Sequence, residues 1–108
     1  LTELCRKVQI RHVTALHSQG EVIYWSYNEL QDKRSKQMAE IMAATSGYAL
    51  DVPMGLAVGG GFKDWFIKEF RRPGFTVEVG RGKNPLPIND TFKIYAKLCE
   101  MLTITAIM

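Results

Sequence analysis

The sequence lacks the features of several large protein classes. Its 108 residues hold two cysteines, Cys5 and Cys99, too few for a disulfide scaffold and in no metal-binding spacing. Apolar runs stay far short of the ~20 residues that a membrane span needs, and no repeat or low-complexity segment is visible. The composition, 46% apolar and 23% charged, is that of an ordinary globular domain. Disorder, collagen, coiled coil and a membrane partner are therefore not expected.

A strong excess of charge is also missing. The 14 Lys and Arg residues against 11 Asp and Glu leave a net charge of +3. Nucleic-acid-binding proteins usually carry a concentrated basic stripe with aromatic side chains placed for stacking, whereas the aromatics here fall at core-like spacings. We therefore expect no nucleic acid as a partner. An anionic small substrate or polymer explains the mildly basic charge equally well.

Hydrophobic periodicity predicts helices alternating with strands, which is the pattern of an α/β fold. Strands are expected over 9–16, 22–25 and 75–79, and helices over 1–8, over 29–45, from Phe62 up to Pro73, and from Asn89 or Asp90 onward. Gly47 is expected to end the second helix, and 51–61 to form a loop. Three strands are few for a sheet, so we expect part of a larger mixed, twisted sheet flanked by helices.

Two of these helices carry apolar side chains at helical spacing. The third helix is expected to bury an aromatic stripe, formed by Phe62, Trp65, Phe66 and Phe70. The last helix is expected to bury a second stripe, formed by Phe92, Tyr95, Leu98, Cys99 and Leu102. Because Cys99 belongs to that stripe, we expect its thiol to be free and buried.

His17 is the first residue that could carry chemistry. Alternation places it on one strand face with Val13 and Ala15, at a strand end, where α/β proteins place ligands. An imidazole there could bind zinc or act as a base, and a histidine satisfied by the backbone explains the position as well. His12 falls on the opposite face, so the two histidines are not expected to share one metal.

Glu78 is the second candidate, because it interrupts the apolar strand 75–79. Alternation places Glu78 with Thr76 on one face and the apolar residues of the strand on the other. A carboxylate in such a strand is costly unless it is paired, exposed or used. Burial would suit it to act as a general base; a solvated strand face is the alternative.

The run Gly59–Gly61 opens a helix and is the third candidate. Backbone amides at a helix N-terminus can cradle an anion, although close packing or a hinge explains three glycines equally well. Lys63, one turn in, could add a charge for a substrate carboxylate; a solvated lysine is the alternative. A conventional zinc site needs at least three ligands, and no HxxE or HExxH motif is present to supply them.

Three segments in one order carry a resemblance. They are His17-Ser18-Gln19-Gly20 at a strand end, Gly60-Gly61-Phe62-Lys63-Asp64-Trp65 opening a helix, and Phe75-Thr76-Val77-Glu78-Val79 in a strand. Their order and spacing resemble the C-terminal half of the zinc carboxypeptidases of the carboxypeptidase A type. With Asn84-Pro85-Leu86-Pro87 added, the string looks most like the bacterial gamma-D-glutamyl-diaminopimelate endopeptidases, which cut peptidoglycan stem peptides.

The resemblance implies roles for four residues. His17 matches the third zinc ligand of the family, and Glu78 matches the general base that acts on the zinc-bound water and then protonates the leaving amine. Ser18 matches a position that contacts substrate, and Lys63 falls near the specificity pocket, where a cation suits the extra carboxylate of diaminopimelate. The implied cofactor is zinc, and the implied partner is a peptidoglycan-derived peptide.

The resemblance also implies what this chain does not contain. The HxxE motif and the transition-state arginine of the family lie upstream of the third ligand, so residues 1–108 are expected to be the C-terminal portion of a zinc-peptidase catalytic domain. The chain by itself is expected to bind zinc weakly and to be inactive. A missing N-terminal half and a second copy of the chain are both open as partners. The location implied is outside the cytoplasm, in the cell wall or a developing spore.

A non-catalytic remnant of the same fold, serving as a binding or assembly module, is the alternative function. The presence of an HxxE motif in the full-length protein separates the two hypotheses.

Overall fold

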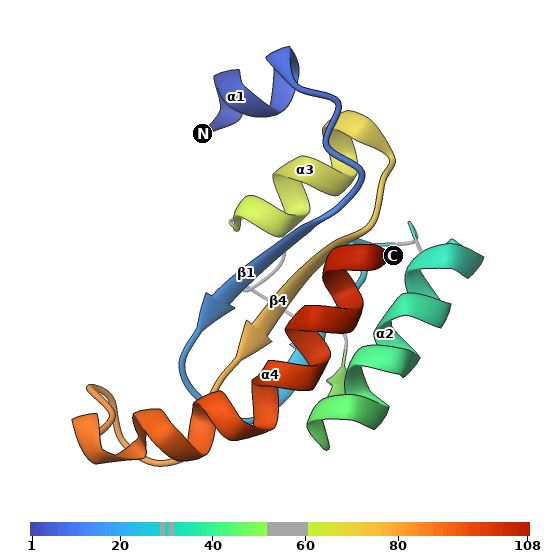
Figure 1. Cartoon of the computed structure of the whole chain (residues 1–108). Coiled ribbons are helices and arrows are strands. Elements are labelled where there is room, and N and C mark those ends of the chain that lie inside the picture. Colours follow the sequence, from blue (N-terminus) through green and yellow to red (C-terminus); the bar gives the residue numbers. More distant parts are fainter. Residues whose placement is uncertain (29, 31, 52–60) are drawn as a thin grey trace.

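A four-stranded mixed sheet with helices on both faces forms the computed structural model, which describes residues 1–28, 30, 32–51 and 61–108 (Figure 1). The elements are α1 (Thr2–Lys7), β1 (Val13–His17), β2 (Val22–Tyr24), α2 (Lys33–Ser46), β3 (Ala49–Asp51), α3 (Phe62–Phe70), β4 (Gly74–Glu78), the 3-10 turn η2 (Ile88–Asp90) and α4 (Thr91–Ile107). Most of the expected loop over 51–61, with Gly59 and Gly60, lies outside the described residues. None of the described helices is long and apolar enough to cross a membrane.

The strand order is β1-β4-β2-β3. β1 runs parallel to β4, β4 antiparallel to β2, and β2 parallel to β3. The expected mixed α/β sheet is therefore confirmed, but the expectation of three strands missed β3, which is three residues long. β4, from late in the chain, lies between β1 and β2, although these two are neighbours in sequence.

The two faces of the sheet have different characters, as the alternation predicts. Ile23, Phe75 and Val77 are fully buried and pack against α2 and α4, which lie side by side (Figure 1). This cluster contains most of the core, and its buried residues are Ile23, Trp25, Met38, Ala39, Met42, Tyr48, Phe75, Val77, Leu98 and Met101. The opposite face of the sheet carries His17, Thr76 and Glu78 and lies toward α3.

α2 begins later than expected and ends where expected. Asn28 has a positive φ of 50°, and the amide of Leu30 donates to the carbonyl of Tyr27 at 2.9 Å, so a turn precedes the helix. Asp32 then caps α2, its carboxylate accepting from the Ser35 amide at 2.8 Å. Gly47 ends the helix in the left-handed region with a φ of 76°, which confirms its expected role.

The apolar stripe expected on α4 is confirmed at Leu98, which is buried, and is wrong at its other four positions. Phe92 is 82% exposed and Tyr95 62% exposed, and Cys99 is also exposed, so the expected buried thiol is wrong too. The buried side chains of α4 are Leu98, Met101 and Thr105. A second stripe on the same helix has the same spacing as the expected one; it is formed by residues 94, 98, 101, 105 and 108. Periodicity therefore could not show which stripe is buried, and packing against α2 determines it.

The aromatic stripe of α3 is partly confirmed. Phe66 is fully buried, and its ring contacts that of the half-buried Phe70 at 5.0 Å between centroids, with the two ring planes tilted by 49°. α1 packs beside this helix, with the Arg6 guanidinium 5.7 Å from the centre of the Trp65 ring. Cys5 on α1 is the buried cysteine, at 2% exposed.

Gly47 and Gly80 both have a positive φ, but only at Gly80 would an added Cβ clash with a neighbour. Substituting each glycine therefore distinguishes the stability lost to backbone strain from the stability lost to a clash. In Gly47→Ala the added Cβ has no neighbour within 4 Å, so the left-handed φ is the source of strain. We expect a loss of about 1 kcal/mol in the free energy of unfolding. At Gly80, with a φ of 71°, a Cβ would also lie 2.7 Å from the Leu86 Cδ1 atom, so Gly80→Ala should cost about 1 kcal/mol more. Urea unfolding of both variants measures this, and equal losses would contradict the packing at Gly80.

The exposure of the two cysteines predicts one reactive thiol. Under native conditions a thiol reagent such as DTNB should modify one cysteine quickly, and Cys99→Ser should remove the fast phase. Cys5→Ser should leave that phase unchanged, and the second thiol should react only after denaturation. Two slow thiols in the native protein would mean that the outer face of α4 is covered.

Candidate functional site

His17 and Glu78 lie next to each other at the ends of two adjacent strands. They are direct partners in the parallel pairing of β1 with β4, and each is the last residue of its strand. Partners in a parallel pair point to the same face, and neighbouring strands lie about 4.8 Å apart. The structure therefore brings the two main sequence-predicted site residues together at the carboxyl end of the strands, where open α/β sheets place ligands.

A cavity of about 250 Å³ lies in front of this pair. Its walls come from β1, β2, β4 and the start of α3, and are formed by His17, Tyr24, Gly61, Lys63, Asp64, Thr76 and Glu78. His17 is exposed, and Glu78 is half-buried. Glu78 is thus neither sealed in the core nor fully solvated, which is a suitable position for a group that exchanges protons with a bound molecule.

Lys63 lies in the same cavity wall but is not the solvated lysine of the alternative interpretation. Its side chain is 4% exposed, and its Nζ donates to the Ser26 carbonyl at 2.6 Å and to the Asp64 carboxylate. The charge of Lys63 is therefore largely neutralised inside the protein. A substrate carboxylate could reach this ammonium only by sharing it with Asp64.

Ser18 is directed away from the cavity. The Ser18 hydroxyl donates to the Oδ1 atom of Asn84 at 2.9 Å, and the Ser18 carbonyl accepts from Asn84 Nδ2 at 3.0 Å. Ser18 is not among the described residues that line the cavity. The peptide bonds Ser18–Gln19 and Asn84–Pro85 are both cis.

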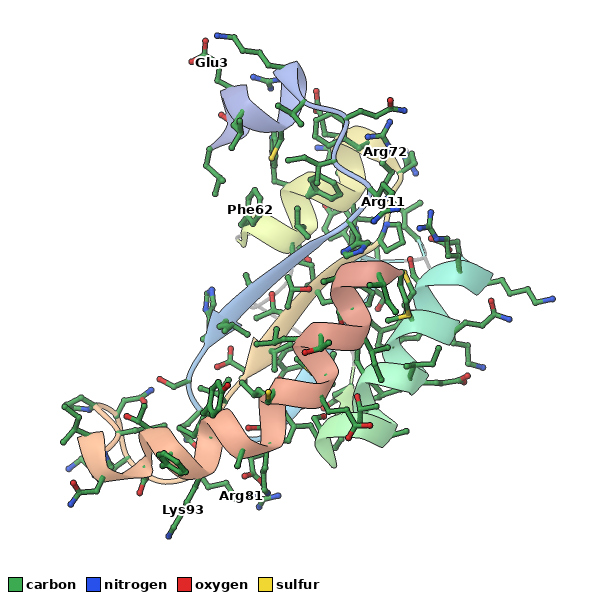
Figure 2. All side chains as sticks on the ribbon, viewed as in Figure 1. Glu3, Arg11, Phe62, Arg72, Arg81 and Lys93 are labelled. Atoms are coloured by element: carbon green, nitrogen blue, oxygen red, sulfur yellow. The ribbon has the colours of Figure 1, made fainter. Side chains whose placement is uncertain are left out.

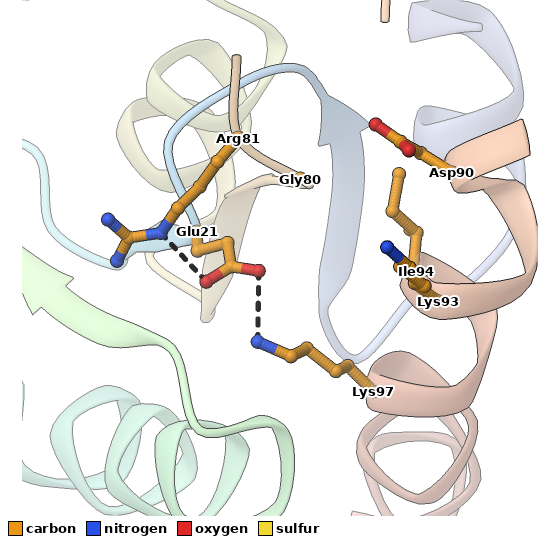
Figure 3. A pocket seen from close by; sticks show the side chains of 7 residues that line it. All are labelled: Glu21, Gly80, Arg81, Asp90, Lys93, Ile94 and Lys97. Atoms are coloured by element: carbon orange, nitrogen blue, oxygen red, sulfur yellow. Dashed lines mark hydrogen bonds and ion pairs between the residues drawn. The ribbon is translucent and has the colours of Figure 1, made fainter. Parts of the chain in front are cut away.

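A second cavity of about 250 Å³ lies beyond the strand ends, beside α4. Glu21 projects into it and accepts from Arg81 Nε at 2.9 Å and from Lys97 Nζ at 3.0 Å (Figure 3). These hydrogen bonds, that from Lys97 first, lower the pKa of the Glu21 carboxyl below its ordinary value. Arg81 and Lys93 lie at the same end of the molecule (Figure 2), so this region is basic apart from Glu21 and Asp90.

Zinc is not accommodated by the described residues on their own. No group of three or more His, Cys, Asp or Glu side chains suited to a metal ion occurs within 1–28, 30, 32–51 and 61–108. A catalytic zinc site takes about three protein ligands and keeps one position open. His17 could supply one nitrogen donor, and the other ligands would have to come from outside these residues.

Several residues of the site were not identified from the sequence. Thr76 lies on the same strand face as Glu78, so the alternation along the strand could have identified Thr76 as a site residue. Tyr24 joins the cavity because β2 pairs antiparallel to β4, with Tyr24 opposite Thr76. No local pattern encodes that pairing, nor the bonds between Ser18 and Asn84, which are 66 positions apart.

Two known proteins are similar to this chain. It is 45% identical over 96 residues to Gamma-D-glutamyl-L-diamino acid endopeptidase 1 of Lysinibacillus sphaericus, a match that covers 88% of this chain and 24% of that protein. It is 40% identical over 81 residues to Uncharacterized protein YqgT of Bacillus subtilis (strain 168), covering 75% and 22%. No protein-family model matches the chain.

The chain therefore spans about a quarter of the length of the curated relatives it matches. The predicted resemblance to gamma-D-glutamyl-diaminopimelate endopeptidases agrees with this similarity to a gamma-D-glutamyl-L-diamino acid endopeptidase. The assignment to the zinc carboxypeptidases stays a prediction.

The buried Lys63–Asp64 pair predicts a large stability effect. Lys63→Met leaves the buried Asp64 carboxylate without its lysine, so we expect a loss of about 3–5 kcal/mol in the free energy of unfolding. Lys68→Met, an exposed lysine on the same helix, is the matched control and should stay within about 0.5 kcal/mol of wild type. Urea unfolding compares them, and equal small losses would contradict a structural role for the pair.

Proposed function

We propose that residues 1–108 are the C-terminal portion of the catalytic domain of a peptidase that hydrolyses the gamma-D-glutamyl-diaminopimelate bond of peptidoglycan stem peptides. The observation that carries the proposal is the register of β1 with β4, which sets His17 beside Glu78 in the wall of one cavity. The 45% identity to a gamma-D-glutamyl-L-diamino acid endopeptidase supports the choice of bond.

Glu78 is the proposed general base and acid. Its carboxylate takes a proton from the water whose oxygen attacks the amide carbonyl carbon. The same carboxyl group then gives that proton to the leaving nitrogen as the C–N bond breaks. The half-buried position of Glu78 lets it keep contact with water while facing a bound peptide.

His17 is the proposed zinc ligand of this chain. Its imidazole lies on the same face as Glu78 and next to it, so a metal held there would lie within reach of the same substrate. When bound, zinc lowers the pKa of water and polarises a carbonyl oxygen. The remaining ligands would come from other parts of the full-length protein, and residues 1–108 by themselves would be inactive.

Lys63 and Ser18 are the proposed substrate-side residues. Lys63 lies in the wall of the cavity and could share its charge between Asp64 and a carboxylate of diaminopimelate. Ser18 follows His17 directly and would contact the peptide through its backbone N–H, since its carbonyl and hydroxyl both bond to Asn84. The proposed location is outside the cytoplasm, in the cell wall or a developing spore.

Substitution of Glu78 tests the proposal in the full-length protein. Glu78→Gln keeps the shape of the side chain and removes the base, so hydrolysis of a gamma-D-Glu-diaminopimelate peptide should fall by about 10²–10⁴-fold while zinc content stays unchanged. Glu100→Gln, an exposed glutamate on α4, is the matched control and should retain wild-type activity. Retained turnover by Glu78→Gln would remove Glu78 from its role.

Metal analysis tests His17 separately. His17→Ala should lower the zinc content of the full-length protein, whereas His12→Ala, the other histidine, should leave it unchanged. Equal zinc content in both variants would end the ligand assignment. A full-length protein that neither binds zinc nor cleaves the peptide would favour the alternative, a non-catalytic binding or assembly module.

A further inference from the structure

We infer that Asn84 is a positioning residue that fixes the turn after His17 and thereby the placement of His17 relative to Glu78. This inference rests on the proposed function, because it assigns a role at the same site. The resemblance implies that Ser18 contacts substrate, whereas in the structure the Ser18 hydroxyl bonds to Asn84 within the protein.

The chain segments that leave His17 and Glu78 remain side by side beyond the sheet. The Val79 amide donates to the His17 carbonyl at 2.7 Å, and the Gly20 amide donates to the Gly80 carbonyl at 2.7 Å. These two backbone hydrogen bonds extend the pairing of β1 with β4 past the two site residues. Whatever holds the 18–20 turn against the 80–87 loop therefore also holds the two residues in register.

The Asn84 side chain joins the 80–87 loop to the 18–20 turn through Ser18. Its amide group donates to the Ser18 carbonyl at 3.0 Å and accepts from the Ser18 hydroxyl at 2.9 Å, so both ends of the amide are used on one residue. A carboxamide offers a donor and an acceptor side by side. Aspartate would place a carboxylate oxygen against the Ser18 carbonyl, and alanine would lose both bonds.

Glu21 adds a second tie, made by ion pairs. Its carboxylate binds Arg81 of the same loop and Lys97 of α4 (Figure 3). The Arg81 and Lys97 side chains are 75% and 49% exposed, so salt weakens these ion pairs. The neutral bonds of Asn84 are much less sensitive to salt, which makes Asn84 the better candidate for a constant constraint.

Amide hydrogen exchange tests this contact without relying on activity. In Asn84→Ala, exchange at Gly20 and Val79 should accelerate by about tenfold, because two hydrogen bonds that hold the turn are lost. Exchange at Ile23, which is fully buried in the core, should not change, and this separates local loosening from general destabilisation. Asn89→Ala, an exposed asparagine near the start of α4, is the matched control and should leave all three amides unchanged. Unchanged exchange at Gly20 and Val79 in Asn84→Ala would overturn the inference.

Kinetics of the full-length protein test the consequence for the site. Asn84→Ala should lower kcat by about 10–100-fold with KM within about twofold, because the reacting groups are misplaced while substrate binding is retained. Asn84→Gln, which keeps the amide donor and acceptor on a longer side chain, should recover part of the loss. A raised KM with unchanged kcat would mean that Asn84 binds substrate and would also overturn the inference.

The two proposals can fail separately. Full activity in Glu78→Gln would reject the proposed reaction, while the exchange rates at Gly20 and Val79 would still decide whether Asn84 holds the turn. Conversely, unchanged exchange in Asn84→Ala would leave the role of Glu78 intact. Ser18→Ala separates the two roles of that serine: faster exchange with unchanged KM supports the positioning contact, and unchanged exchange with a higher KM contradicts it.

Discussion

The parallel pairing of β1 with β4 is the constraint on which the candidate site depends. Residues 61 positions apart in sequence become direct neighbours because the two strands end together. A shift of the register by one residue would turn Glu78 to the opposite face of the sheet, since side chains alternate along a strand. The packing of Phe75 and Val77 in the core therefore also decides where Glu78 points.

The two faces of the sheet divide structural and chemical roles. The face toward α2 and α4 is buried along β2 and β4, and it supplies most of the core. The face toward α3 is polar at the strand ends, where a buried Lys63–Asp64 pair and the half-buried Glu78 share one cavity. Charges can remain there because the apolar face already stabilises the sheet.

The sequence predicted the parts of this fold that depend on local periodicity. The strand at 74–78 has the expected alternation of burial, and Gly47 ends its helix because glycine takes the left-handed φ without the strain of a side chain. Periodicity failed on α4, where two stripes have equal spacing and packing chose the one with Leu98 and Met101. The cavity depends on pairings between distant strands, so the place of Tyr24 in its wall carried no local signal. The contact of Asn84 with Ser18 joins two loops far apart in sequence, and no local pattern predicts it.

The open edge of β1 bears on how the proposed site would be completed. Within the described residues β1 pairs only with β4, and Leu16 is 50% exposed. Uncovered edge strands with apolar side chains are normally avoided because they invite further pairing. β4 flanks His17 within the sheet, and the start of α3 lies across their shared cavity. The open side of β1 is therefore where a further strand could be added next to His17, and the remaining ligands of the proposed zinc site could come with it.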